Sequence, residues 1–245
     1  MNYIHIISFI IFQIISPIKT QSQFIRVDLW NDSIRLDTTA EINDIKFVQI
    51  FDASTNEGEL VSEKYLNNLK SGIFKEITLF RLSVNKRMLS LLGNVKTESI
   101  VFNNCKFEDS SFLFTNKHVL YLVLSGGNIK CINNSIRKMN QLKALSVMTS
   151  SIRKLPKCIF KFKQLNFLDL TGCQIENLDD VLVKNKQLKI LKMMECNLKY
   201  KDVYRIPAML SNLEELELDI KYEDCIRFKK ENSNIKYITN VCNVF

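Results

Sequence analysis

The sequence predicts an α/β solenoid, in which short repeats stack so that their strands form one parallel β-sheet. Successive copies of a two-residue apolar motif are separated by 23, 22, 23, 23, 23 and 25 residues. In each copy the two apolar residues lie two positions apart, which places both on one face of a strand. The copies are Ile77/Leu79, Ile100/Phe102, Leu122/Leu124, Leu145/Val147, Leu168/Leu170, Leu191/Met193 and Leu216/Leu218.

The clearest repeat shows which family the pattern resembles. It places Leu165, Leu168, Leu170, Cys173 and Ile175 on the pattern L-x-x-L-x-L-x-x-N/C-x-L, so the chain resembles leucine-rich repeat proteins, in particular secreted, ectodomain-like members. The resemblance implies a horseshoe with a parallel sheet on its concave face and irregular or short helical segments on its convex face. It also implies binding of a protein partner.

The chain divides into four segments, of which the first, residues 1–22, precedes the repeats and their two caps. Residues 74–220 hold seven repeats, and residues 23–73 are expected to form an N-terminal cap with one degenerate repeat. Within that cap, alternating apolar residues predict strands near 24–30 and 45–50, and a helix is expected over about 60–69. Residues 221–245 are expected to cap the other end, because a terminal repeat has no neighbour to cover its core.

Residues 1–22 read as a secretory signal peptide. The apolar run Ile4–Ile15 is shorter than the roughly 20 residues needed to span a bilayer. Thr20 and Ser22 supply small residues for cleavage before Gln23. No Lys or Arg precedes the run, so an uncleaved anchor or a buried strand stays open. We expect a secreted, extracellular protein without stable membrane insertion after cleavage.

The composition is that of one folded globular unit with a basic balance. Lys and Arg number 34 against 26 Asp and Glu, which gives a net charge of +8. Basic residues such as Lys154, Lys157, Lys161 and Lys163 are dispersed over the repeats. This distribution favours a solvated convex face over a stripe that follows phosphates, and we predict no nucleic-acid partner.

Three of the seven cysteines occupy the N/C position of the repeat pattern, which we call the ladder position. This is the ninth position of the pattern, eight residues after Leu165 in the clearest repeat. The three are Cys105, Cys173 and Cys196, and we expect buried free thiols that act as weak donors. Cys173 and Cys196 lie in consecutive repeats, so their Cα atoms should be about 5 Å apart and a disulfide is the alternative. Free thiols are preferred because side chains on neighbouring parallel strands point alongside each other.

The other cysteines and two sequons bear on export. A disulfide between Cys225 and Cys242 is expected to close a loop over the last repeat, whereas pairing of Cys131 with Cys158 stays open. The sequons at Asn31 and Asn133 would accept N-linked glycan in the secretory pathway.

The sequence offers little for catalysis. His118 is the only histidine outside the signal segment, and no HExxH or CxxC motif is present. Zinc sites need three or four well-spaced ligands. We therefore predict no catalytic, cofactor-binding or metal-binding residues and no cofactor. We also predict that the protein is not an enzyme; catalysis is kept as a remote alternative.

The outward residues of the strands are the expected partner-binding surface. Exposed aromatic residues and methionines in a patch suggest a protein interface, and the acidic residues on the last strand would attract a basic element of the partner. The candidates are Val101, Tyr121, Val123, Met148, Phe167, Asp169, Ile190, Lys192, Met194, Glu215, Glu217 and Asp219.

Two functional classes follow from this surface. The first is a secreted binding protein of unknown partner, acting as a recognition factor or a soluble decoy. The alternative is an intracellular adaptor whose repeats present a substrate to another protein; the segment Leu155-Pro156-Lys157-Cys158-Ile159 resembles a Leu-Pro-x-x-Ile variant frequent in intracellular members of the family.

Overall fold

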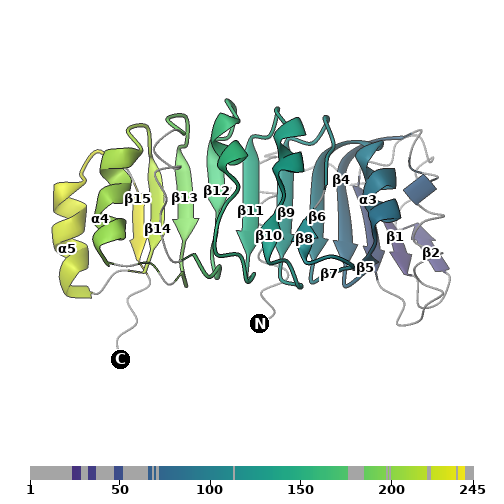
Figure 1. The fold of residues 1–245 in the computed structure, drawn as a ribbon, viewed down its shortest axis with the longest axis horizontal. Coiled ribbons are helices and arrows are strands. Elements are labelled where there is room, and N and C mark those ends of the chain that lie inside the picture. Colours follow the sequence, from purple (N-terminus) through teal and green to yellow (C-terminus); the bar gives the residue numbers. More distant parts are fainter. Residues whose placement is uncertain are drawn as a thin grey trace.

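The protein is described by a computed structural model that covers residues 24–28, 33–36, 47–51, 66–67, 69, 72–112, 114–175, 185–196, 198, 200–219, 222–235 and 237–240. Within these residues, 11 strands form one sheet with the order β15-β14-β13-β12-β11-β9-β6-β4-β3-β1-β2. The strands stand side by side along the long axis of the molecule (Figure 1). The predicted leucine-rich repeat solenoid of the α/β class is confirmed.

Every neighbouring pair in the large sheet is parallel except β1 and β2, which pair antiparallel at one edge. The strands are β1 (Phe24–Asp28), β2 (Ser33–Leu36), β3 (Phe47–Phe51), β4 (Ile73–Phe80), β6 (Lys96–Asn103), β9 (Tyr121–Ser125), β11 (Ala144–Met148), β12 (Phe167–Asp169), β13 (Ile190–Met193), β14 (Glu215–Leu218) and β15 (Tyr237–Asn240). The parallel sheet thus continues beyond residues 74–220 on both sides, through β1 and β3 and through β15.

The repeat period sets the register of the sheet. Leu145 lies opposite Leu122 on one side and Leu168 on the other, and Leu191 lies opposite Leu216. All 14 residues of the predicted apolar pairs are at most 1% exposed. Each leucine therefore packs against its equivalent in the neighbouring repeats, which is how stacked repeats bury a face that one repeat alone could not.

A residue with positive φ follows six of the strands, β4, β6, β9, β11, β12 and β13, and turns the chain out of the sheet. These residues are Arg81, Asn104, Gly126, Thr149, Gly172 and Glu195, with φ between 48° and 71°. The backbone N–H of Asn104 donates to the carbonyl of Ser125 at 2.7 Å, and that of Thr149 donates to Thr171 at 2.9 Å. The bend is thereby tied to the next repeat by a backbone hydrogen bond.

The ladder cysteines follow these bends and are free thiols, as predicted. The Sγ atoms donate to strand carbonyls of the preceding repeat: Cys105 to Leu79 at 3.3 Å, Cys173 to Val147 at 3.0 Å and Cys196 to Leu170 at 3.1 Å. Burial raises the pKa of the Cys196 thiol, and the neighbouring Cys173 adds to the effect, so that the pKa is about 12. Burial also raises the pKa of the Cys173 thiol. The thiols of Cys173 and Cys196 therefore stay protonated and act as internal donors rather than as nucleophiles.

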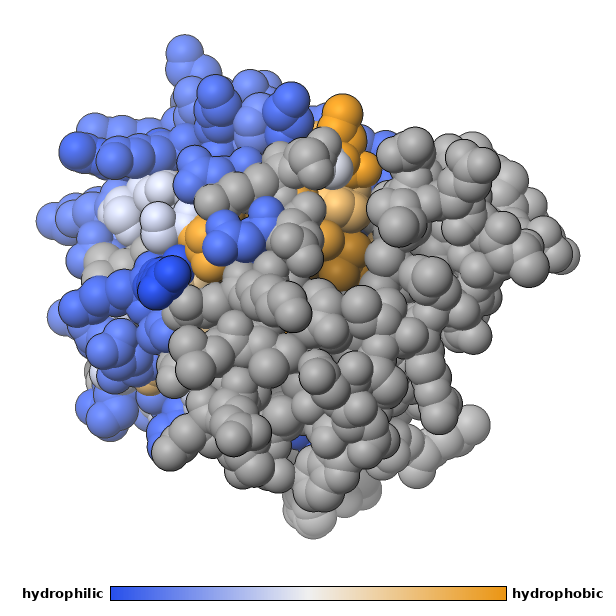
Figure 2. All heavy atoms as spheres, turned by 90° about the vertical axis from the view of Figure 1, so that its right-hand side faces the viewer, coloured by the Kyte–Doolittle hydropathy of each residue, from blue (hydrophilic) through white to orange (hydrophobic). Residues whose placement is uncertain are grey.

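The convex side carries short elements, as the resemblance implied. The helix α3 (Lys86–Gly93) is capped by Asn85, whose side chain accepts a hydrogen bond from the backbone N–H of Met88 at 2.8 Å. The other elements are β5 (Ser83–Val84), β7 (Lys106–Phe107), β8 (Ser111–Phe112), β10 (Cys131–Ile132), the 3-10 helices η4 (Asn134–Lys138) and η5 (Lys157–Lys161), α4 (Tyr200–Met209) and α5 (Tyr222–Glu231). Seen from the β2 end, hydrophilic side chains gather along one side of the described residues (Figure 2).

An aromatic cluster fills the core beneath β6. The ring of Phe102 lies 5.4 Å from Phe107, 5.6 Å from Phe112 and 5.9 Å from Phe114, in tilted or edge-on geometry. All four rings are at most 3% exposed. Edge-on aromatic pairs add to the stabilisation from buried area, so this cluster is a major stabilising element of the solenoid.

Several predictions fall on residues outside the described part of the chain. These are the signal segment 1–22, the sequon at Asn31, most of the helix expected over 60–69, and Cys242. The backbone of Cys225 lies in α5, and its disulfide with Cys242 stays a prediction. Among the described residues, no helix is both long and apolar enough to cross a membrane.

Candidate interaction surface on the concave face

The outward side chains of the sheet form rows that cross neighbouring strands. Tyr121, Ala144, Phe167 and Ile190 are successive register partners on β9, β11, β12 and β13, and each is partly exposed. We call these four residues the apolar row. Its next register partner is Glu215 on β14, so the row passes directly from apolar to acidic side chains.

Three predicted members of the surface are less accessible than expected: Asp169 is only 8% exposed, and the other two are valines. Val101 and Val123 are register partners in the middle of the sheet and are only 6% and 3% exposed. The expectation that they form part of an exposed patch is wrong. Val101 lies between Thr78 and Val123 in the register, and Val123 lies between Val101 and Ser146. All four side chains are buried, so each valine is flanked by covered neighbours. Met148 and Met194, by contrast, are partly exposed.

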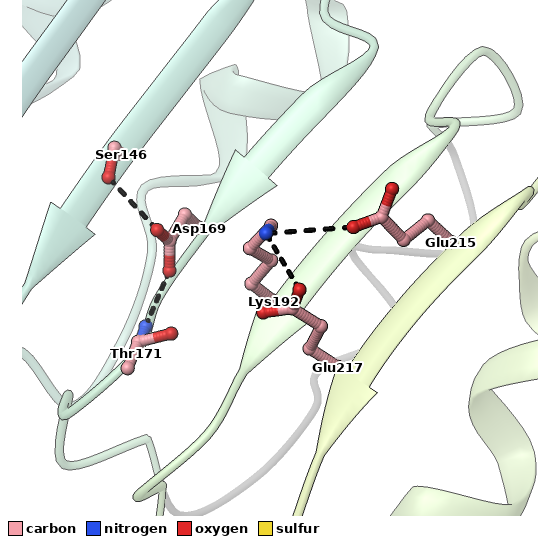
Figure 3. A network of polar contacts seen from close by, with 6 residues as sticks. All are labelled: Ser146, Asp169, Thr171, Lys192, Glu215 and Glu217. Atoms are coloured by element: carbon pink, nitrogen blue, oxygen red, sulfur yellow. Dashed lines mark hydrogen bonds and ion pairs between the residues drawn. The ribbon is translucent and has the colours of Figure 1, made fainter. Parts of the chain in front are cut away.

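Lys192 organises the polar part of the surface. Its Nζ atom lies 2.7 Å from Oε1 of Glu217 and 3.5 Å from Oε1 of Glu215, both on the neighbouring strand β14 (Figure 3). Burial lowers the pKa of Lys192, but the hydrogen bond to Glu217 and the attraction of Glu217, Glu215 and Asp169 outweigh it, and the pKa is raised overall. The lysine therefore stays charged and holds the two glutamates in place.

Asp169 lies beside Lys192 in the sheet register and is buried. Its Oδ2 accepts a hydrogen bond from the Ser146 hydroxyl at 3.3 Å, and its Oδ1 accepts one from the backbone N–H of Thr171 at 3.0 Å (Figure 3). Burial raises the pKa of Asp169, and the hydrogen bonds from Thr171 and Ser146 together with Lys192 offset only part of that effect. The carboxylate is thus held at an energetic cost.

We predict that Asp169→Asn stabilises the protein at neutral pH. An amide can accept from Thr171 and meet Ser146 without the cost of burying a charge. Because the folded-state pKa is raised, stability decreases as pH rises from about 4, the ordinary pKa of Asp, through the folded-state value. Urea unfolding at pH 7.5 and pH 4 should show the gain of the variant at the higher pH and a smaller gain at the lower. An equal difference at both values would contradict this assignment.

The acidic end of the surface is partly neutralised within the fold. Glu214 pairs with Lys189 at 2.8 Å, and the Asp219 carboxylate accepts a hydrogen bond from the backbone N–H of Glu195. Glu215 and Glu217 pair with Lys192. With Asp219 the three glutamates make four acids against two lysines, a local charge of −2. The attraction for a basic partner is retained, although it is weaker than four free acids would give.

The structure brings together residues that the sequence analysis left out. Ala144 completes the apolar row, Ser146 holds Asp169, and Lys189 neutralises Glu214. Each of them lies 22 to 25 residues from a residue of the candidate surface. This repeat spacing was the signal in the sequence that could have identified them. Among the described residues, no group of three or more His, Cys, Asp or Glu side chains is arranged to hold a metal ion.

Comparison with solved structures supports the fold. The chain is similar to an internalin, InlF, from Listeria monocytogenes, with 17% identity and a TM-score of 0.50, over 80% of this chain and 61% of that one. It is also similar to the leucine-rich repeat domain of the type III effector XopL, with 17% identity and a TM-score of 0.51, over 88% of this chain and 73% of that one. No family model and no curated protein matches the sequence.

Proposed function

We propose that this chain, which has the leucine-rich repeat fold, is a secreted protein that binds a protein partner through the concave face of its sheet. It would act as a recognition factor or as a soluble decoy. The observation that carries the proposal is the apolar row, in which Tyr121, Ala144, Phe167 and Ile190 lie side by side across four strands and remain partly exposed. A rigid sheet holds these side chains in fixed positions, which lowers the entropic cost of binding.

The surface favours a partner element with a particular chemistry. The apolar row supplies aromatic and aliphatic contacts of the kind that anchor protein interfaces. It runs into the ion-paired group of Lys192, Glu215 and Glu217, where the local charge is negative. A segment with apolar residues at one end and Lys or Arg at the other matches this order, and the charge would speed its approach.

Replacing Phe167 and Met194 together by Asp is expected to abolish binding without unfolding the protein. Both side chains are partly exposed, so little core packing is lost, whereas two carboxylates would be desolvated in the interface. A displayed library of random peptides, selected on the wild-type protein, supplies the probe. Selected peptides should carry apolar and basic residues and lose more than about 100-fold in affinity for the variant, the loss of about 3 kcal/mol that interface hot spots give.

A matched variant separates this loss from a general effect of added charge. Arg153→Asp and Lys154→Asp alter exposed residues outside the strands of the sheet, and the selected peptides should still bind. Retention of the peptides by the Phe167/Met194 variant, with unchanged circular dichroism, would remove the concave face as the binding surface.

Export is supported by the apolar N-terminal run and by the placement of one sequon. Asn133 is exposed and caps η4, its side chain accepting from the backbone N–H of Ser135 at 3.0 Å. N-terminal sequencing and intact mass of protein from the medium of eukaryotic cells should show a chain that starts near Gln23 and carries glycan at Asn133. An unprocessed chain retained in the cells would overturn export.

The intracellular adaptor remains the second candidate because of the cysteines. Five described cysteines, Cys105, Cys131, Cys158, Cys173 and Cys196, are free thiols. Free thiols are typical of reducing compartments, whereas secreted proteins tend to pair them. In an adaptor, the same concave surface would hold the substrate that is presented to another protein.

A further inference from the structure

The positive charge of the chain is concentrated in three central repeats. Residues 110–168 contain no Asp or Glu but ten Lys and Arg residues. The rest of the chain holds 24 basic residues (34 minus 10) against all 26 acids, a balance of −2. The ten are Lys117, Lys130, Arg137, Lys138, Lys143, Arg153, Lys154, Lys157, Lys161 and Lys163. The net charge of +8 therefore belongs to one part of the solenoid.

The fold aligns these charges between neighbouring repeats. Lys130 and Arg153 are 23 residues apart, as are Lys138 and Lys161, so each pair occupies equivalent positions of adjacent repeats. The 3-10 helices η4 and η5 pack against each other, and the Cys158 thiol of η5 donates to the Asn134 carbonyl of η4 at 3.9 Å. The result is a basic convex ridge, which we define by Arg137 and Lys138 on η4 and Lys157 and Lys161 on η5.

Two of the ridge cations act on the same thiol. Burial raises the pKa of Cys158, while the positive charges of Arg137 and Lys161 both act to lower it. Two cations from different repeats thus act on one sulfur atom. Like charges on helices that pack against each other repel unless a bound anion compensates them.

The ridge residues are available to a ligand. All four side chains are exposed, and none of them forms an ion pair with a residue that the structure describes. The convex ridge is separate from the concave surface, since Lys157 and Lys161 lie on η5 and not on the sheet.

We propose that the basic convex ridge binds a sulfated polysaccharide. A linear chain of sulfates offers repeated negative charges to the aligned cations. Eight of the ten basic residues are lysines, point charges that lack the planar fork with which Arg reads phosphates. The exposed large apolar side chains among the described residues are Ile73 and Ile226, both outside residues 110–168. The described side chains of the ridge therefore supply neither an apolar anchor for a membrane nor an aromatic platform for nucleic-acid bases. The basic ridge itself does not depend on the proposed export. Only the choice of a sulfated ligand over other polyanions rests on that proposed function.

The test compares two variants that lose the same charge. The ridge variant carries Arg137→Gln, Lys138→Gln, Lys157→Gln and Lys161→Gln; the control carries Lys86→Gln, Lys96→Gln, Lys229→Gln and Lys230→Gln, all at exposed positions. Binding of each to immobilised heparin is measured at several salt concentrations. We expect the ridge variant to bind at least about tenfold more weakly at 0.15 M salt and with a smaller salt dependence, and the control to stay within about threefold of wild type.

The remaining outcomes overturn the proposal in distinguishable ways. Equal weakening of both variants would mean that only net charge matters and that the ridge is not a site. Tighter binding to duplex DNA, or to vesicles containing phosphatidylserine, than to heparin would remove the polysaccharide as the ligand. Loss of peptide binding by the Phe167/Met194 variant is independent of all these results, so failure of the ridge leaves the concave-face proposal standing.

Discussion

Phe102→Ala is expected to destabilise the protein by about 3–5 kcal/mol, the range for truncating a buried phenylalanine. The side chain is 1% exposed and lies 5.4 to 5.9 Å from three other buried rings. Its removal leaves a cavity that rings fixed by neighbouring repeats cannot fill. Urea unfolding followed by circular dichroism measures the loss.

A truncation on the sheet's outer face provides the comparison. Phe167 is the same residue type in the apolar row but is partly exposed, so Phe167→Ala should cost about 1 kcal/mol or less. Similar losses for the two variants would show that the aromatic cluster around Phe102 contributes no more than surface packing.

Gly127→Ala is expected to destabilise by about 3 kcal/mol or more. The residue has φ of +80°, a conformation that costs an L-residue roughly 1–2 kcal/mol. An added Cβ would also lie 2.1 Å from the carbonyl oxygen of Cys105, a backbone atom that cannot rotate away. The chain must therefore shift between two repeats, and thermal unfolding should show a clear fall in Tm.

The neighbouring glycine is a matched control. Gly126 also has positive φ, at 67°, but its added Cβ would meet Oδ1 of Asn104, the end of a side chain that can rotate. Gly126→Ala should therefore cost only the conformational strain of about 1–2 kcal/mol. If Gly126→Ala proved the more damaging of the two, the close approach at Cys105 would not be the reason for glycine at 127.

The fold follows from the sequence because one period determines both register and burial. Leu122, Leu145, Leu168 and Leu191 occupy one position of four consecutive repeats, and the structure places them opposite one another with no exposed surface. The ladder cysteines were also predictable as free thiols, because their position in the repeat fixes where their side chains point.

The candidate site was only partly predictable. The period identifies outward residues such as Val123 and Phe167, but it does not show that Val123 is covered and Phe167 is not. Pairing is likewise a matter of side-chain conformation: Lys192 reaches Glu217 and Glu215 on the next strand, which spacing alone permits but does not determine. The basic ridge was missed because the individual lysines appear scattered, whereas the signal is the absence of acids over residues 110–168.

The constant register also has a consequence for how the chain folds. Paired strand residues in the repeats lie 22 to 25 positions apart in the sequence. A separation of 23 in a chain of 245 residues corresponds to a relative contact order of about 0.09. Such a value is usual for helical proteins. Forming each new strand pair closes a loop of the same short length and costs a similar entropy. Folding is therefore expected to begin at the central aromatic cluster and to spread outward repeat by repeat. Unfolding should proceed from the ends, through partly folded species rather than in one step.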